Sequence, residues 1–205
     1  MSRIDLVALL RAQGVELGPA LAALHALYAD LDARTARNTA SLNLPCSRGC
    51  SACCEESVLL SPLEFYAVWD HLQSTCDDAA LAQIVADGLA LYHLHRDVIA
   101  ALNQPPPAGM TDHTALLRDV RFRCPILDAA GACRAYPARE IKGRLFGCSF
   151  NDDGGIYGCH LVGAHLADQL VTLTRARPNA NRVAALPLGT GQQLYPFYIH
   201  ALYGP

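Results

Sequence analysis

Apolar residues recur at helical spacing near the start of the chain. Leu21, Leu24 and Tyr28 fall three or four positions apart, and the charged residues close to them can face water. Pro45 ends this pattern directly before a run of cysteines. We therefore expect a helical N-terminal segment over residues 1–44.

A strong helix start follows at residues 61–64, Ser-Pro-Leu-Glu. Ser61 is typical of an N-cap, Pro62 of the first helical position, and Glu64 closes a capping box. The two capping side chains would satisfy backbone N–H groups that have no partner inside the helix. This helix should run to about Gln73.

A longer helix is expected next, starting at Thr75 or Asp77 and keeping one apolar face as far as Leu102. The three prolines Pro105–Pro107 stop it and mark the best internal linker. A short helix should follow around His113–Asp119. Outside the cysteine run, the elements predicted up to this point are all helices.

Beyond Phe122 the pattern changes to short apolar arms on either side of turn signals. Residues 124–133 should turn at Asp128–Gly131. Residues 148–159 should turn in the same way at Asp152–Gly155. Each segment has one cysteine on each arm, about level across the turn, so we predict two small β-hairpins.

The end of the chain is predicted to be helical over Leu161–Thr174 and turn-rich from Pro187. Its aromatic patch should pack back onto the core: Tyr195, Phe197, Tyr198 and Tyr203. The predicted fold class is mainly α with small β-hairpins, a single domain organised around a cysteine-ligated metal site. Its parts are an N-terminal helical segment, a cysteine-cluster domain over 45–175 and a tail over 176–205 that packs on the domain.

Composition and charge narrow the possible functions. The 205 residues carry a formal charge of −3 with a pI near 6.2, which gives no electrostatic footprint for nucleic acid. No uninterrupted apolar run reaches the roughly 20 residues of a membrane span, and the first residues do not resemble a signal peptide. We therefore expect a cytoplasmic protein that binds neither nucleic acid nor membrane.

Nine cysteines is a high count for a reducing compartment, where disulfides are rare and clustered cysteines are more often metal-binding or catalytic. Eight of them are clustered and only Cys76 stands alone, a division that scattered buried thiols would not produce. The eight candidate metal ligands are Cys46, Cys50, Cys53, Cys54, Cys124, Cys133, Cys148 and Cys159.

The first cysteine run cannot deliver all its thiols to one ion from a straight helix. Cys46 and Cys54 would lie about 12 Å apart along the axis, whereas thiolates on tetrahedral zinc sit about 2.3 Å from the metal. Gly49 offers a break that leaves Cys46 in a loop and Cys50–Cys54 in a helical turn. Because adjacent side chains diverge in helices and strands, Cys53 and Cys54 suit two neighbouring metals, or one ligand beside one buried thiol.

Eight cysteines make two four-thiolate sites, or one cluster with accessory thiols. Each predicted hairpin offers two ligands, and the first run could offer two to each. A four-thiolate site for a divalent ion carries net negative charge, so nearby cations should stabilise it. The arginines close to a cysteine in sequence are Arg48, Arg123, Arg134 and Arg144. An ordinary solvated surface is the alternative interpretation of these four.

Thiolates suit zinc, iron and iron–sulfur clusters alike. The spacing Cys46-x3-Cys50-x2-Cys53 is the one that radical S-adenosylmethionine enzymes use, but helices precede it here and the chain is short for their barrel. A non-radical [4Fe–4S] centre is the stronger iron–sulfur alternative. Reduced structural cysteines without any metal are the third possibility.

Two signatures resemble those of the CxxCxxCC cysteine-cluster proteins, the YkgJ-like family described as a zinc- or iron-chelating domain. Residues 46–54, CSRGCSACC, are similar to the first signature, and residues 124–139, CPILDAAGACRAYPAR, to the second. Residues 57–64, SVLLSPLE, are similar to the strand and helix start between them. The resemblance spans about residues 44–160. It implies these metal-binding residues: Cys46, Cys50, Cys53, Cys54, Cys124 and Cys133.

Two departures from the family pattern bear on the site. The first gap between cysteines is three residues instead of two. The family's next element has the form RPxxCR, whereas residues 139–144 read REIKGR, so Gly143 replaces a cysteine ligand. Cys148, Cys159 or His160 could take its place, or the site could bind metal differently or not at all.

Three functional hypotheses follow. The first is a metal-binding protein that holds zinc or iron through thiolates in a structural or metal-handling role. The second is an Fe–S redox protein, an oxidoreductase or the redox part of a modifying enzyme. The third is an adaptor whose metal shapes a surface for a protein partner, with the aromatic tail as the place to look. No nucleophile with a partner or general base can be named, so catalysis is left open.

Overall fold

The computed structural model describes residues 3–47, 49–105, 113–117 and 119–205. The described part is mainly helical with small sheets, which confirms that part of the predicted fold class. Its α-helices are α1 (Leu6–Arg11), α2 (Leu17–Thr39), α3 (Pro62–Thr75), α4 (Asp78–Leu94), α5 (Arg96–Leu102), α6 (Ile141–Leu145), α7 (His160–Leu166), α8 (Ala176–Ala184) and α9 (Tyr195–Tyr203). Its strands are β1 (Leu59–Leu60), β2 (Ser149–Phe150), β3 (Ile156–Tyr157), β4 (Thr174–Arg175) and β5 (Gln193–Leu194).

Two short 3₁₀-helices complete the described elements, η1 (Thr114–Leu117) and η2 (Tyr136–Ala138). The first is what remains of the short helix predicted around residues 113–119. Residues 106 and 107 of the predicted proline linker, and Arg48 among the predicted cations, lie outside the described residues.

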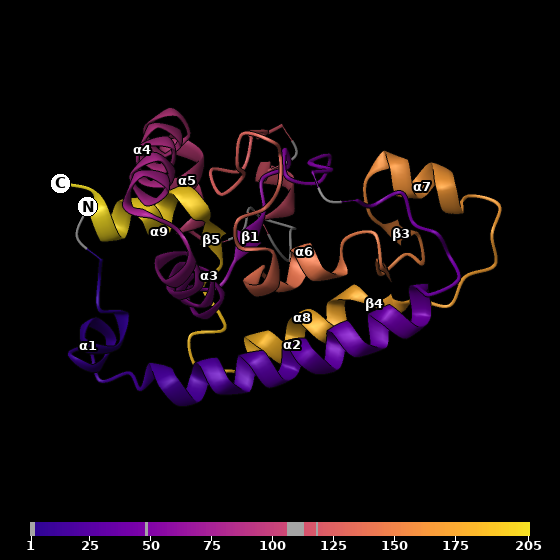
Figure 1. Ribbon diagram of the computed structural model, residues 1–205, viewed down its shortest axis with the longest axis horizontal. Helices are drawn as coiled ribbons and strands as arrows, with labels where there is room; N and C mark the ends of the chain where they lie inside the picture. Colours follow the sequence, from indigo (N-terminus) through magenta and orange to yellow (C-terminus); the bar gives the residue numbers. More distant parts are fainter. Residues whose placement is uncertain (1–2, 48, 106–112, 118) are drawn as a thin grey trace.

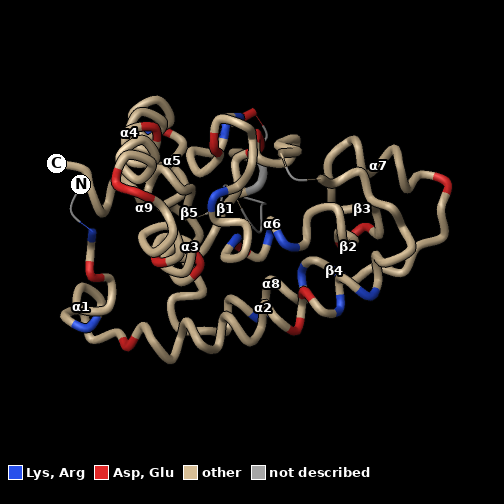
Figure 2. The backbone as a smooth tube through the Cα atoms, in the orientation of Figure 1, with Lys and Arg blue, Asp and Glu red and all other residues tan. Residues whose placement is uncertain are grey.

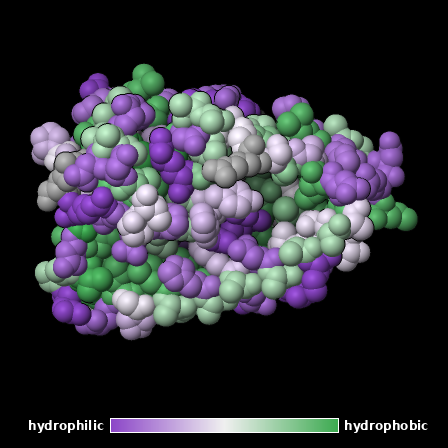
Figure 3. Space-filling view, viewed as in Figure 1, coloured by the Kyte–Doolittle hydropathy of each residue, from purple (hydrophilic) through white to green (hydrophobic). Residues whose placement is uncertain are grey.

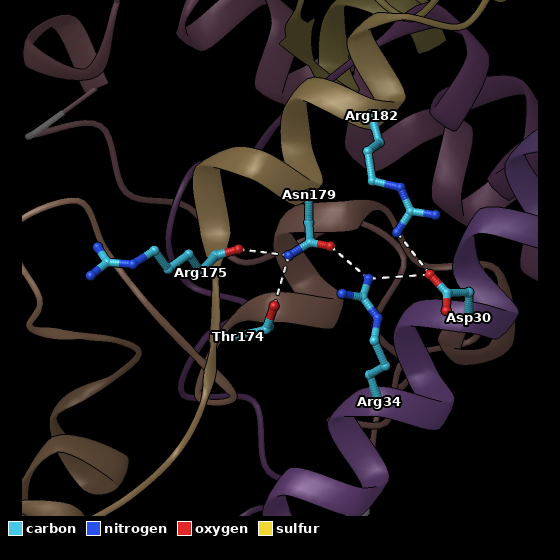
Figure 4. Close-up of polar contacts among 6 residues, drawn as sticks. All are labelled: Asp30, Arg34, Thr174, Arg175, Asn179 and Arg182. Atoms are coloured by element: carbon cyan, nitrogen blue, oxygen red, sulfur yellow. Dashed lines mark hydrogen bonds and ion pairs between the residues drawn. The ribbon is translucent and has the colours of Figure 1, made fainter.

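The long helix α2 runs along one edge of the molecule, and α8 lies beside it (Figure 1). A polar cluster fastens the two helices together (Figure 4). The Asp30 carboxylate on α2 forms ion pairs with the guanidinium groups of Arg34 and Arg182, with nitrogen–oxygen distances of 3.2 Å and 2.8 Å. Asn179 on α8 accepts from Arg34 at 2.8 Å and donates to Thr174 at 2.9 Å. Segments from opposite ends of the sequence are thereby joined.

The predicted capping box at the start of α3 is confirmed. The Ser61 hydroxyl accepts from the Glu64 backbone N–H at 3.4 Å, and the Glu64 carboxylate accepts from the Ser61 N–H at 2.8 Å. The helix runs two residues past the predicted end, to Thr75. It carries the fully buried Phe65 and Trp69, whose rings stack with centroids 5.7 Å apart.

The next predicted helix starts as expected, with Asp77 as N-cap, but it breaks at His95 into α4 and α5. The break lets α5 turn to face β5, where the buried Gln193 side chain donates to the Ile99 carbonyl at 3.1 Å. α4 packs closely along α9 (Figure 1). A Cβ at Gly88 would lie 2.5 Å from Cδ1 of Ile199, so only glycine fits this crossing without a shift.

One of the two predicted hairpins is confirmed. β2 and β3 pair antiparallel, with Ser149 opposite Tyr157, and β4 adds to β2 in parallel. The helix predicted over residues 161–174 is wrong beyond Leu166, because the chain leaves the helix to supply β4. The segment 124–133 forms a turn closed by a single bridge between Leu127 and Cys133, without regular strands.

The prediction of a turn-rich tail is wrong from Tyr195 onward, where α9 begins. Pro196 lies in the first turn of this helix, a position that suits its fixed backbone angle. Tyr195 and Tyr198 are buried in the main core, and the Tyr198 hydroxyl donates to the Leu60 carbonyl at 2.9 Å. β5 pairs antiparallel with β1 just before the helix, which fixes the tail to the middle of the chain.

Charge and hydropathy divide the surface unevenly. The second half of α2 carries two acidic residues followed by two arginines, whereas α9 contains no Lys, Arg, Asp or Glu (Figure 2). Hydrophobic residues gather around α1 and the start of α2 on the face shown in Figure 3. Among the described residues, no helix combines the length and apolar character that crossing a membrane requires.

Candidate metal centre

The first cysteine run consists of two consecutive turns. The Cys50 N–H donates to the Ser47 carbonyl at 3.0 Å, and the Cys54 N–H donates to the Ser51 carbonyl at 2.8 Å. Gly49 has a φ of +88°, so the predicted break at this glycine is confirmed. The helical turn expected over residues 50–54 is wrong, because turn hydrogen bonds replace the helical ones.

This run docks against the segment 124–133 through its backbone. The Cys124 N–H donates to the Cys54 carbonyl at 2.8 Å. A Cβ at Gly131, which has a φ of +81°, would lie 3.0 Å from the Gly49 carbonyl oxygen. Two glycines therefore permit the close approach that brings the two cysteine-bearing segments together.

The turn at residues 128–131 is held by its own side chain. The Asp128 carboxylate accepts from the N–H groups of Ala130 at 2.9 Å and Ala132 at 2.8 Å. Arg123 donates to the Asp128 carbonyl at 2.7 Å. This arginine is exposed, as the solvated-surface alternative expected, and its hydrogen bond supports the turn that leads to Cys133.

The adjacent cysteines lie closer together than predicted. Their Sγ atoms are 4.0 Å apart, because a turn does not splay neighbouring side chains as a helix or strand does. Two thiolates on one tetrahedral zinc would be about 3.8 Å apart, given metal–sulfur distances of about 2.3 Å. The expectation that Cys53 and Cys54 point apart is therefore corrected.

The hydrogen bond between these thiols separates their acidities. Donation from Cys54 lowers the pKa of Cys53 to about 7, and the same bond raises the pKa of Cys54. Metal ligation requires the deprotonated thiolate, so Cys53 is the most readily available ligand of the pair.

The structure brings the predicted cysteines together in two neighbouring groups. In the first, burial raises the pKa of Cys124 to about 12 and of Cys133 to about 11, and the charge of Cys53 adds to both effects. The charges of Cys124 and Cys133 also raise the pKa of Cys54. We call Cys53, Cys54, Cys124 and Cys133 the inner thiol group.

The remaining four cysteines are neighbours through Cys46, whose Sγ is 3.9 Å from the position that a Cβ at Gly147, just after α6, would take. Burial raises the pKa of Cys46, and the charges of Cys159, Cys50 and Cys53 raise it further. Burial also raises the pKa of Cys148 to about 11, and the charge of Cys46 is the second-largest cause of this rise. We call Cys46, Cys50, Cys148 and Cys159 the outer thiol group. Because the charge of Cys53 in the inner group raises the pKa of Cys46 in the outer group, the two groups are neighbours.

One arginine that the sequence did not single out lies near both groups. The guanidinium of Arg139 opposes the burial that raises the pKa values of Cys46, Cys133 and Cys148. It is held by donation to the Gly143 carbonyl at 3.2 Å. Arg144, in contrast, is buried against Asp32 and the Tyr28 ring, so neither interpretation offered for it from the sequence applies.

Glu140 was also missed. Its carboxylate is buried and accepts a hydrogen bond from the Tyr195 hydroxyl at 2.5 Å. Its negative charge raises the pKa values of Cys53, Cys124 and Cys133. The sequence offered no local signal for this burial, because a Glu between Arg139 and Ile141 is equally typical of an exposed position.

The other predicted alternatives lie at the edge of the cluster. His160 is the first residue of α7 and is exposed. Cys159, directly before it, is the N-cap of the same helix and belongs to the outer thiol group. Cys76 is the C-cap of α3 and packs against the main core.

The thiols are neighbours without yet forming a coordination sphere. Across the described ranges, no three Cys, His, Asp or Glu side chains are arranged closely enough to hold one ion. The donor chemistry nevertheless suits zinc or iron, since all eight candidates are free thiols and one adjacent pair has a separation close to that of two zinc ligands. Binding an ion would require the sulfurs to shift toward one another.

No protein-family model, curated protein or solved structure matches this chain. The cysteine cluster is therefore interpreted from its own geometry.

Proposed function

We propose that this chain is a metal-binding protein that holds zinc or iron through clustered cysteine thiolates, in a structural or metal-handling role. One observation carries the proposal. Eight cysteines from three separate segments converge in two neighbouring groups, while the ninth, Cys76, lies apart on a helix end. The resemblance of both cysteine signatures to a chelating family supports the same function.

The local structure around the thiols gives the metal a physical role. The cysteine-bearing segments are turns, one bridge and a two-residue hairpin, which are too small to be stable by themselves. An ion bound to several of these segments would contribute its binding free energy to folding. Soft thiolate donors select zinc, copper(I) or iron–sulfur chemistry over calcium or magnesium.

Elemental analysis and an absorption spectrum on protein purified without oxygen test this proposal. Colourless protein with one or two zinc ions per chain is the expected result. Two zinc ions would match one ion for each thiol group. Fully folded protein without metal, from both aerobic and anaerobic preparations, would contradict the proposal.

An Fe–S cluster protein is the second candidate, and the outer thiol group favours it. The charges of Cys50 and Cys53 both raise the pKa of Cys46, so the three thiols are neighbours, and their sequence spacing Cys46-x3-Cys50-x2-Cys53 is one that [4Fe–4S] proteins use. A brown sample with iron, acid-labile sulfide and a broad visible absorption band would select this redox function instead of zinc.

The third hypothesis, an adaptor for a protein partner, needs another surface than the aromatic tail. Tyr195 and Tyr198 are buried in the core, and the Phe197 and Tyr203 side chains are partly buried against it. Those rings hold α9 in place.

A further inference from the structure

Cys53 and Cys54 are adjacent residues whose thiols are in contact with each other. Their Sγ atoms lie 4.0 Å apart and share a hydrogen bond. Both residues are partly exposed, and neither thiol is part of a disulfide. The pair therefore offers two free sulfurs, at a defined separation, to a molecule that arrives from solution.

The backbone holds this pair in place on both sides of Cys54. The Cys54 N–H donates to the Ser51 carbonyl at 2.8 Å, and the Cys54 carbonyl accepts from the Cys124 N–H at 2.8 Å. The first bond anchors the peptide group that joins the two thiols, and the second anchors it to the segment 124–133. Because a preorganised site loses less conformational freedom on binding, this arrangement favours a ligand that takes both sulfurs at once.

A disulfide between these two thiols would be strained. The peptide bond between them is trans, so their Cα atoms lie about 3.8 Å apart. Disulfides usually join Cα atoms that are about 4.4–6.8 Å apart, and departures from this geometry make the bond easier to reduce. We therefore expect the pair to remain a dithiol under conditions in which an ordinary disulfide would persist.

A single atom bonded to both sulfurs avoids this strain. Two bonds of about 2.3 Å at a tetrahedral angle hold their sulfurs about 3.8 Å apart, whereas a disulfide would require the observed separation of 4.0 Å to shrink to about 2.05 Å. Thiolates are soft donors, so the bridging atom should be soft as well. Trivalent arsenic with one carbon substituent is such an atom, because two sulfurs satisfy its two remaining valences.

We propose that Cys53 and Cys54 form a dithiol site for monosubstituted trivalent arsenicals, R–As=O. Each thiol gives up its proton and forms one arsenic–sulfur bond, while the arsenic–oxygen double bond breaks and the oxygen leaves with both protons as water. Arsenic stays trivalent and neither sulfur is oxidised, so the step needs no further reagent. This site goes beyond the proposed zinc or iron function and does not depend on it.

The test treats the full-length reduced protein with phenylarsine oxide in a large excess of glutathione, before and after metal removal by a chelator. A single thiol loses the arsenical to glutathione, whereas a chelating pair keeps it until a dithiol such as 2,3-dimercaptopropanol is added. Intact-protein and tandem mass spectrometry should show one phenylarsenic group across Cys53 and Cys54. Cys53→Ser and Cys54→Ser should each weaken retention by about a hundredfold or more, because the second bond is then no longer intramolecular.

Cys76→Ser is the matched control, because it also removes one partly exposed free thiol but leaves the pair intact. This variant should retain the arsenical as the wild type does. Iodoacetamide labelling of the wild-type adduct, mapped by peptide mass spectrometry, gives a measurement that needs no variant. Cys53 and Cys54 should be protected together, and this result decides the question even if the serine variants do not fold.

Unchanged retention in both serine variants would overturn the site, as would an adduct on other cysteines that leaves Cys53 and Cys54 open to iodoacetamide. A disulfide between Cys53 and Cys54 in air-exposed protein would overturn the strain argument and the site with it. Protein that retains the arsenical but never contains zinc or iron would contradict the proposed function alone. Protein that contains metal but, once the metal is removed, does not retain the arsenical would contradict this inference alone.

Discussion

The helical layer of α3, α4 and α9 and the cysteine-bearing turns are held together by different means. In the helical layer, Phe65 and Trp69 are fully buried and Tyr198 stacks on Phe65 with centroids 4.8 Å apart. The turns instead rely on backbone hydrogen bonds and carry half-buried thiols. Apolar burial stabilises the first region, whereas in the second the proposed metal ligation would add to the backbone hydrogen bonds. The following substitutions test this difference.

Trp69→Ala should have the largest effect. It removes a fully buried ring that also donates to the Tyr203 hydroxyl at 3.2 Å, and such truncations cost about 3–5 kcal/mol. Urea unfolding followed by far-UV circular dichroism measures the loss, which should be the same with and without chelator. A loss that depends on the chelator would show that the two regions are not independent.

Cys124→Ser should lower bound metal and stability together, and Cys53→Ser should behave in the same way. With free zinc at a hundred times its Kd, the lost ligation corresponds to about 2.7 kcal/mol of unfolding free energy. Thermal unfolding with paired metal analysis measures both quantities. Cys76→Ser is the matched control and should change neither; metal loss in that variant would contradict the division of the nine cysteines.

Gly88→Ala and Gly163→Ala apply the same substitution to a helix in the helical layer and to α7, the helix that follows the last cysteine. A Cβ at Gly88 would press on Ile199, and overpacking of this kind costs about 1–3 kcal/mol. Nothing lies within 4 Å of the corresponding Cβ at Gly163 on α7, so alanine should add up to about 1 kcal/mol through helix propensity. Opposite shifts in Tm are expected, and equal shifts would refute the tight α4–α9 crossing.

Asn179→Ala should have the smallest effect, about 1 kcal/mol. It removes the amide that links Arg34 to Thr174 and joins α8 to α2 (Figure 4). Urea unfolding of metal-loaded and metal-free protein should show the same loss. Arg177→Ala, an exposed change on the same helix, should be nearer to neutral because surface ion pairs contribute little.

Local signals in the sequence were reliable where they involved neighbours in the chain. Ser61 and Glu64 form the predicted capping box, Asp77 caps α4, and Gly49 breaks the cysteine run. Each of these features depends on hydrogen bonds or backbone angles within a few residues. Sequence pattern alone is enough to predict such features.

Long-range packing explains what the sequence did not predict. The helix expected over residues 161–174 ends at Leu166 because Thr174 pairs with Ser149, a partner 25 positions earlier. The sequence does not predict α9, because the start of this helix at Tyr195 has no side-chain cap. Pro196 in its first turn was the one local signal available.

The candidate site divides in the same way. The eight cysteines could be selected from their clustering, but their separation into inner and outer thiol groups depends on the docking of Gly49 against Gly131. Arg139 and Glu140 could not be recognised, because the burial of Glu140 and the position of Arg139 between the groups arise only when α6 packs.

The chain contains one tryptophan, and it lies in the helical layer. Its fluorescence therefore reports the melting of that layer, while thiolate-to-metal charge-transfer absorption would report the cysteine-bearing turns. A single cuvette can follow both signals during one unfolding experiment. With metal bound, the protein would thus carry its own pair of optical probes, one for each region, without any label.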